Sequence, residues 1–384
     1  MAKQTAKKKT ETTTQKKVGK QTVKKAVEKT VSKTINANSS KKSTPKPIVK
    51  PKKEVSNEPI IVKSNFNSDR FMDFFGGEQF LKKNQKKFKG VTIDKHYKGK
   101  VLENKYGECY HISDFTNIDI VEPNYDRLKE KLFSDLKVLP GIAEITESNL
   151  RREGIFLISQ LTEHYRYGND AINFINLIDN RNAVKIYEQL SARFTSSNPL
   201  LLANSAFFNL SDIAFLDIET LGLSEVPLFL IGIATFKNNQ LITEQIFVRE
   251  LKEEKAALHF LGELLQGKQA IGTFNGKSFD VPFIRKRMER HDLKHEIKLP
   301  HFDLKYFSQK AFSNLVNDCK LSTLERAFFN VERIDDVPGI EIPKYYSTYI
   351  KTKNIGSVVP IIDHNKQDLI STAKLFMKLY EIWG

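Results

Sequence analysis

The chain has 384 residues, 40% of them hydrophobic, which is enough for two or three domains with sizeable cores. The formal net charge is +15, but residues 1–60 hold 17 lysines against four acids, so the remainder, with 44 basic and 42 acidic residues, has a net charge of only +2. The two cysteines exclude a disulfide framework or a thiolate zinc site. The most apolar stretch, 226–236, is too short to span a membrane. We therefore expect a cytoplasmic protein, or one associated with the nucleoid.

Residues 1–64 form a lysine-rich segment without a single aromatic residue. Such a segment buries too little apolar surface to offset the entropy lost on ordering, so we expect a disordered basic tail. Lysine runs attract nucleic acid by releasing counterions, without sequence preference. We interpret the tail as a nucleic-acid tether, with a segment that only aids solubility as the alternative.

Residues 65–135 are predicted to form a small, partly β module, because aromatic residues begin at Phe66. Strands are expected around Val101–Leu102 and Cys109–Ile112, with a turn near Tyr106-Gly107. No set of residues in this module indicates catalysis.

Residues 136–205 are predicted to be helical, with the pattern LPGIA at 139–143 joining two short helices. Thr146 is the expected N-cap of the second helix and Gly154 the residue just past its end. The pattern resembles a helix-hairpin-helix element, whose turn amides bind phosphates, although Ala143 stands where that family usually has glycine. A hairpin that only packs its helices is the alternative. A further helix is expected at 183–193.

From residue 206 to residue 384, short strands alternate with helices. Strands are expected at 213–218, 270–274 and 301–304, and a hairpin at 228–236 and 241–248 around Asn238-Asn239. Helices are expected at 253–265, 281–290 and 358–382. This order predicts an α/β domain with a mixed sheet covered by helices on both faces.

Asp217 and Glu219 lie two residues apart on the first of these strands. Alternate residues of a strand share a face, so both carboxylates point one way while Leu216 and Ile218 enter the core. Two adjacent buried acids repel, and a divalent cation would relieve that cost. Oxygen ligands favour Mg²⁺ or Mn²⁺ over zinc. Two solvated acids at a strand end are the alternative.

Asp280 closes the run FNGKSFD at 274–280, which follows a strand and opens a helix. An aspartate at this place is commonly a helix N-cap. Asn275 and Gly276 occupy the loop between strand and helix, where functional groups often lie. Asp280 is therefore a candidate both for a helix N-cap and for a residue of a functional site.

His364 and Asp368 are four residues apart on the last predicted helix. This spacing puts them on one face, about 6 Å apart. The His could orient or deprotonate a water while the Asp holds a metal. A surface pair without function is the alternative.

Together these residues resemble the DEDD branch of the ribonuclease H-like superfamily, which includes 3'–5' proofreading exonucleases. The resemblance is closest to the YprB-type ribonuclease H-like proteins, through DIETLGL at 217–223, FNGK at 274–277, FD at 279–280, HFDL at 301–304 and HN at 364–365 with Asp368. Three residues separate His364 from Asp368, which is the spacing of the Tyr-type branch with His in the Tyr position. YprB-type proteins share this arrangement.

The resemblance implies a mixed five-stranded sheet and two-metal phosphodiester hydrolysis with two Mg²⁺ or Mn²⁺ ions. One ion would be held by Asp217, Glu219 and Asp368, and Asp217 would bridge to the second, to which Asp280 contributes. His364 would accept a proton. The implied substrate contacts are Thr220, Leu221, Asn275 and Lys277. Asp303, on a strand near the site, is a weaker candidate, and a structural hydrogen bond is the alternative for it.

We therefore predict a 3'–5' exonuclease that acts on DNA or RNA. A structure-specific endonuclease is the first alternative, because this fold hosts both modes. A non-catalytic protein that binds nucleic acid through its basic tail is the second, and the complete set of carboxylates argues against it. The sequence does not indicate the oligomeric state.

Overall fold

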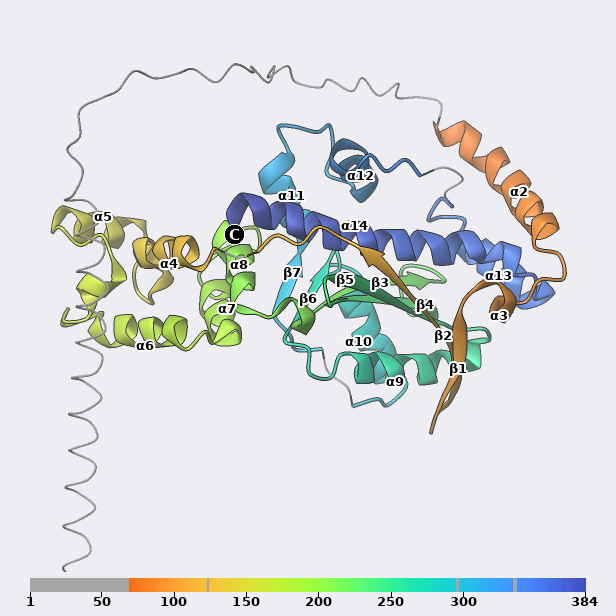
Figure 1. Ribbon diagram of the computed structural model, residues 1–384, viewed down its shortest axis with the longest axis horizontal. Helices are drawn as coiled ribbons and strands as arrows, with labels where there is room; N and C mark the ends of the chain where they lie inside the picture. Colours follow the sequence, from red (N-terminus) through yellow and green to blue (C-terminus); the bar gives the residue numbers. More distant parts are fainter. Residues whose placement is uncertain (1–68, 123, 295–296, 334–336) are drawn as a thin grey trace, which may run out of the picture. The chain divides into compact units, whose positions relative to one another are not determined.

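The computed structural model describes residues 69–122, 124–294, 297–333 and 337–384 (Figure 1). The predicted tail, 1–64, lies outside them. In the described part of the chain, seven strands form one sheet in the order β1-β2-β5-β4-β3-β6-β7. The strands are β1 (Gly99–Asn104), β2 (Gly107–Asn117), β3 (Ile213–Thr220), β4 (Leu228–Lys237), β5 (Gln240–Phe247), β6 (Ala270–Thr273) and β7 (His301–Asp303).

The sheet has two strands more than the five predicted. The predicted hairpin at 100–112 exists as β1 and β2, but β2 pairs antiparallel with β5, from Tyr110 opposite Phe247 to Asn117 opposite Gln240. Without β2, the outer backbone groups of β5 would form an open edge. Local patterns identify strands but not their partners, which is why only five were expected in this sheet.

The rest of the sheet follows the prediction closely. β4 and β5 form the expected hairpin, and Asn238 and Asn239 have φ of 49° and 61°, the left-handed backbone of a tight hairpin turn. β3 pairs antiparallel with β4 and parallel with β6, and β6 is parallel with β7. The sheet is therefore mixed, with β3 in its interior.

Helices cover both faces of the sheet, as predicted. Figure 1 shows α14 (Val359–Trp383) across one face, with α9 (Glu254–Leu264) and α10 (Asp280–Arg290) on the other. On the α14 side, the rings of Phe215 and Phe376 pack with centroids 5.5 Å apart. On the opposite side, Leu216 and Ile218 belong to the same buried cluster as Ile284 of α10. The alternation along β3 thus divides its side chains between two cores.

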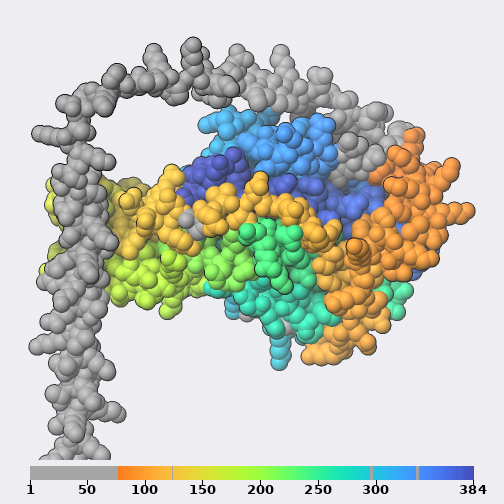
Figure 2. Space-filling view, viewed as in Figure 1, coloured from red at the N-terminus to blue at the C-terminus, as the bar shows by residue number. Residues whose placement is uncertain are grey.

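The first described helix, α2 (Asp69–Lys87), packs on the C-terminal part of the chain. Figure 2 shows this orange segment against the blue surface of the last third. The Tyr345 hydroxyl donates to the carbonyl of Gly77 at 2.6 Å, and the Asn354 amide donates to that of Gln85 at 2.9 Å. α3 (Ile93–His96) follows α2. The partners of α2 are α13 (Ile342–Thr352) and the short helix η6 (Ile355–Ser357).

The chain between β2 and β3 is helical and extends beyond the predicted helical region, 136–205, at both ends. Its elements are α4 (Tyr125–Ser134), η1 (Leu136–Val138), α5 (Glu144–Arg152), η2 (Ile158–Leu161), α6 (Gly168–Asp179), α7 (Ala183–Ser191), α8 (Pro199–Ala203), η3 (Asn204–Phe207) and η4 (Leu210–Asp212). Thr146 is not an N-cap, because α5 begins at Glu144, directly after the turn at Gly141 (φ 78°), and Thr146 lies inside it. Gly154 follows the end of α5 with φ 85°, as predicted.

The remaining elements connect the sheet to its covering helices. They are η5 (Leu251–Glu253), α11 (Leu304–Phe312) and α12 (Leu321–Phe329). Among the described residues, no helix combines the length and apolar character needed to cross a membrane.

Candidate active site

The site is built on β3, where Asp217 and Glu219 share one face, as predicted. Asp217 lies directly opposite Gly232 of β4 in the sheet. α14 crosses this face, and its Asn365 donates to the Asp217 carboxylate, Nδ2 to Oδ2, at 2.7 Å. Glu219 is buried, with 8% of its surface exposed. The interior strand β3 therefore supplies both acids, and α14 crosses the sheet face on which Asp217 lies.

Asp280 reaches β3 from a different element. β6 pairs with β3 only along residues 213–215, so the amide of Ile218 lies beyond the end of that ladder. Asp280, the first residue of α10, accepts a hydrogen bond from this amide at 3.1 Å. The predicted alternative, an N-cap, does not apply, because the N-cap residue is Phe279. Asp280 instead completes the hydrogen bonding of β3 beside the other acids.

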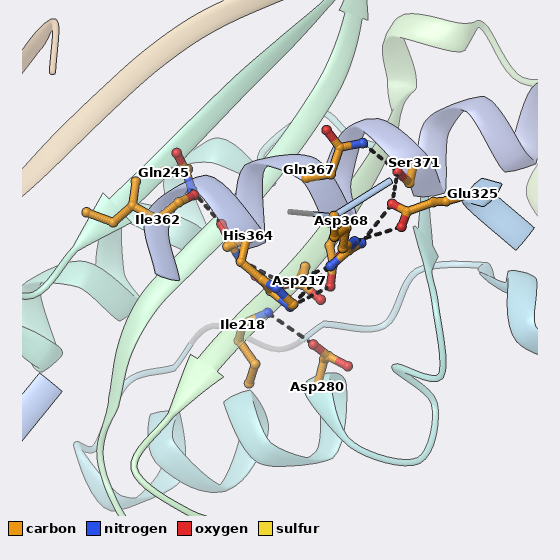
Figure 3. A network of polar contacts seen from close by, with 12 residues as sticks. Asp217, Ile218, Gln245, Asp280, Glu325, Ile362, His364, Gln367, Asp368 and Ser371 are labelled. Atoms are coloured by element: carbon orange, nitrogen blue, oxygen red, sulfur yellow. Dashed lines mark hydrogen bonds and ion pairs between the residues drawn. The ribbon is translucent and has the colours of Figure 1, made fainter. Parts of the chain in front are cut away.

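His364 and Asp368 lie on α14, and Figure 3 shows them together with Asp217 above Ile218 and Asp280. His364 Nε2 is 3.4 Å from Asp368 Oδ2. Asp368 also forms a short ion pair with Arg333, which follows α12. Arg333 in turn lies 3.2 Å from His364, measured from Nη1 to Nδ1.

The charges of these groups act on one another. The pKa of Asp217 is raised well above its ordinary value, first by burial and then by the negative charges of its acidic neighbours, Asp368, Asp280 and Glu219. Burial also raises the pKa of Asp280 to about 7, although the Ile218 amide opposes this shift. A buried acid surrounded by acids is unfavourable unless positive charge compensates it.

Cations would suit this donor set, because four carboxylates supply the hard oxygen ligands that Mg²⁺ and Mn²⁺ prefer. Within the described ranges, however, no three His, Cys, Asp or Glu side chains are grouped closely enough to hold an ion. Asp368 is paired with Arg333 and Asp217 with Asn365, and Asp280 accepts from the Ile218 amide. The four carboxylates and their mutual repulsion therefore suit a bound cation, although in this structure the carboxylates contact other protein groups instead.

A family model described as the RNase H superfamily matches residues 214–380. The matched segment contains all four acids and His364. These residues form an RNase H-like domain. The expected resemblance to this superfamily is thus confirmed for residues 214–380.

Two known proteins are similar to part of this chain. The uncharacterized protein YprB of Bacillus subtilis (strain 168) is 26% identical over 178 residues, which are 45% of this chain and 43% of that protein. The chain therefore matches less than half of that relative's length. The solved structure of the family B DNA polymerase from the hyperthermophilic archaeon Pyrobaculum calidifontis has 15% identity and a TM-score of 0.36, covering 44% of this chain and 24% of the polymerase.

Two of the predicted substrate contacts in the RNase H-like domain, Thr220 and Leu221, lie just past the acids on β3. The Thr220 hydroxyl donates to the carbonyl of Gly222 at 2.7 Å, and the Leu221 amide donates to that of Pro227 at 3.1 Å. Thr220 thus stabilises the loop that follows β3. Leu221 packs partly buried against the core.

The other two, Asn275 and Lys277, lie in the loop between β6 and α10. The fully buried Asp303 accepts their backbone amides at 2.8 and 2.9 Å. Asn275 has φ of 71°, and its side-chain oxygen accepts from Lys305 Nζ at 3.0 Å. Asp303 therefore organises this loop by hydrogen bonds, the structural role that was the alternative for it, and its charge also contributes to raising the pKa of Asp280.

Sequence reasoning missed three side chains of the site. Arg333 contacts Asp368 and His364, and the fully buried Glu325 contacts Arg333, only through the fold, so their sequence context contains no signal. Asn365 belongs to one of the family strings but has no predicted role. One signal did exist for it: the isolated Gly232 in an apolar strand indicates that another group approaches the backbone closely.

Proposed function

We propose that this protein is a metal-dependent nuclease, and that it removes nucleotides from the 3' ends of DNA or RNA. The main support is the position of the half-buried Asp217 beside three further acids: desolvation, and after it the charges of these acids, raise its pKa. A stable fold retains such a cluster at a cost in free energy, and perturbed acids of this kind gather at functional sites. The RNase H-like domain agrees with this choice.

We assign Asp217, Glu219 and Asp368 to one Mg²⁺ or Mn²⁺ ion, and Asp217 with Asp280 to a second. Bound divalent cations would stabilise the attacking and leaving oxygens of phosphodiester hydrolysis. Asn365 orients the Asp217 carboxylate through its 2.7 Å hydrogen bond. This bond selects one rotamer of the central ligand before any ion arrives.

His364 is assigned as the proton acceptor for the attacking water. It lies on the same helix face as Asp368, and its side chain is 19% exposed, so water can reach it. An unprotonated imidazole nitrogen can accept a proton from water, which is the chemistry that this role requires.

The test is cleavage of 5'-labelled single-stranded DNA and RNA with Mg²⁺ or Mn²⁺. A ladder that shortens from the 3' end is expected, whereas discrete internal cuts would indicate an endonuclease. Asp217→Asn should abolish cleavage and retain binding, and Asp126→Asn, at an exposed position, is the matched control. Shifted bands without any cleavage by the native protein would contradict the proposal and favour a nucleic-acid-binding role.

A further inference from the structure

Arg333 is a cation placed among the acids of the candidate site. Its guanidinium pairs with Asp368, an assigned metal ligand, and lies against His364. The chain brings it there by a sharp reversal: Asn330, with φ of 52°, ends α12 in a left-handed turn, and the Val331 amide returns to the Glu325 carbonyl at 3.3 Å. The reversal directs Arg333 back over the helix toward α14.

Glu325 anchors this arginine from behind. Its fully buried carboxylate accepts two hydrogen bonds at 2.7 Å, from Nε and Nη2 of Arg333, and a third, short one from Ser371 of α14. Such a two-point pairing uses the planar fork that only arginine has. Because the anchor does not involve Asp368, it can persist when Asp368 takes another partner.

We propose that Arg333 exchanges partners: it neutralises Asp368 in the metal-free protein and binds a phosphate of the nucleic acid once a divalent cation takes Asp368. This inference rests on the proposed function. A cation on Asp368 must displace the guanidinium from the carboxylate. The donors so released stay at the site, held by Glu325, beside the place where hydrolysis requires a phosphate. Arginine is well matched to phosphate oxygens.

The exchange makes two opposite predictions for one variant. Arg333→Gln removes the competitor, so calorimetry should show Mn²⁺ binding several-fold more tightly. The same variant should bind thymidine monophosphate, with Mn²⁺ present, about tenfold or more weakly, since a hydrogen bond to a charged group is lost. A residue with only a structural role would weaken both affinities or neither.

Two further variants serve as controls for the effect of removing the charge of Arg333. Arg333→Lys keeps a positive charge for the buried Glu325, so it tests the exchange in a chain whose buried acid is still compensated; it too should bind Mn²⁺ more tightly and the nucleotide more weakly. Arg326→Gln removes the same charge from an exposed position of α12 and should change neither affinity. Thermal melting of each variant checks that it is folded.

The outcomes separate this proposal from the proposed function. Native protein that binds no Mn²⁺, and behaves like Asp217→Asn, would overturn both. Native protein that binds Mn²⁺ with the same affinity as Arg333→Gln and Arg333→Lys would overturn the exchange alone. Nucleotide binding that survives in both variants would likewise overturn it.

Discussion

The side-chain amide of Asn365 spans the backbone of Gly232 to reach Asp217. Its Nδ2 donates to Asp217 Oδ2 at 2.7 Å, while its Oδ1 accepts from Nε2 of Gln245, also at 2.7 Å. Asp217, Gly232 and Gln245 face one another in register on β3, β4 and β5. One helix residue therefore connects three strands and determines the orientation of the central acid.

The first prediction concerns this bridge. Asn365→Ala should lower Mn²⁺ affinity and nuclease activity by about 10–100-fold, because the carboxylate of Asp217 loses the group that orients it. Calorimetry and a cleavage assay measure the two effects. Asn149→Ala, at an exposed position, serves as the control. If the Asn365 variant kept full metal affinity, the orientation of Asp217 would have to come from elsewhere.

The second prediction concerns the absence of a side chain at Gly232. A Cβ there would lie 2.8 Å from Cδ1 of Leu369 and closer still to Oδ1 of Asn365, so α14 would have to shift. Gly232→Ala should therefore reduce the free energy of unfolding by about 1–3 kcal/mol, as overpacking does in other cores. Denaturant titration measures it. Gly339→Ala is the control, since its Cβ would meet nothing within 4 Å; equal stability of the two variants would contradict the argument.

Local chemistry explains which parts of the molecule the sequence could predict. The periodicity of β3 and α14 predicted both elements to within about two residues, and the alternation along β3 correctly put Asp217 and Glu219 on one face. Asn238-Asn239 likewise identified its hairpin. Such features depend on neighbours in the chain, which the sequence displays directly.

Long-range contacts explain what the sequence could not predict. The pairing of β2 with β5 joins residues more than a hundred positions apart, and no local pattern names that partner. The turn at Asn330, only three residues before Arg333, directs this arginine toward Asp368. Asp368 lies on a separate helix, α14, so the contact cannot be foreseen from the local sequence. The roles of Arg333 and Glu325 therefore became visible only in the folded chain.

The third prediction concerns pH and metal removal. The folded-state pKa of Asp280 is about 7 against an ordinary 3.8, so the folded protein binds a proton that the unfolded chain releases in this window. Stability of the chelated protein should therefore fall as pH rises from about 4 to about 7, the window between the unfolded-state and folded-state pKa values of Asp280. Asp217, whose pKa is also raised, acts in the same direction.

Melting temperatures with a chelator, recorded across this range, test the prediction. Asp280→Asn should flatten the dependence, whereas the exposed Asp126→Asn should leave it unchanged. Added Mn²⁺ should stabilise the protein most at high pH, where the carboxylates are ionised. Acids with lowered pKa values, such as Asp114 and Asp318, titrate below this window and do not obscure the result. Stability that rose with pH would contradict the assigned shifts.

The fourth prediction concerns the basic tail. Residues 1–60 carry a net charge of +13, while the rest of the chain carries only +2. Deleting them should weaken binding to single-stranded DNA and flatten its salt dependence. The slope of log K against log salt should change by about 0.7 for each phosphate that the protein no longer neutralises. Fluorescence anisotropy at several salt concentrations measures both the affinity and the slope.

A second variant separates charge from length in this experiment. Replacing the 17 lysines of residues 1–60 with glutamine keeps the chain length, so it should reproduce the deletion if counterion release is the cause. Because the candidate acids lie between residues 217 and 368, cleavage at saturating DNA should change in neither variant. An unaltered salt slope in both would mean that nucleic acid is held by the folded part alone. A slope altered only by the deletion would point to tail length instead of charge.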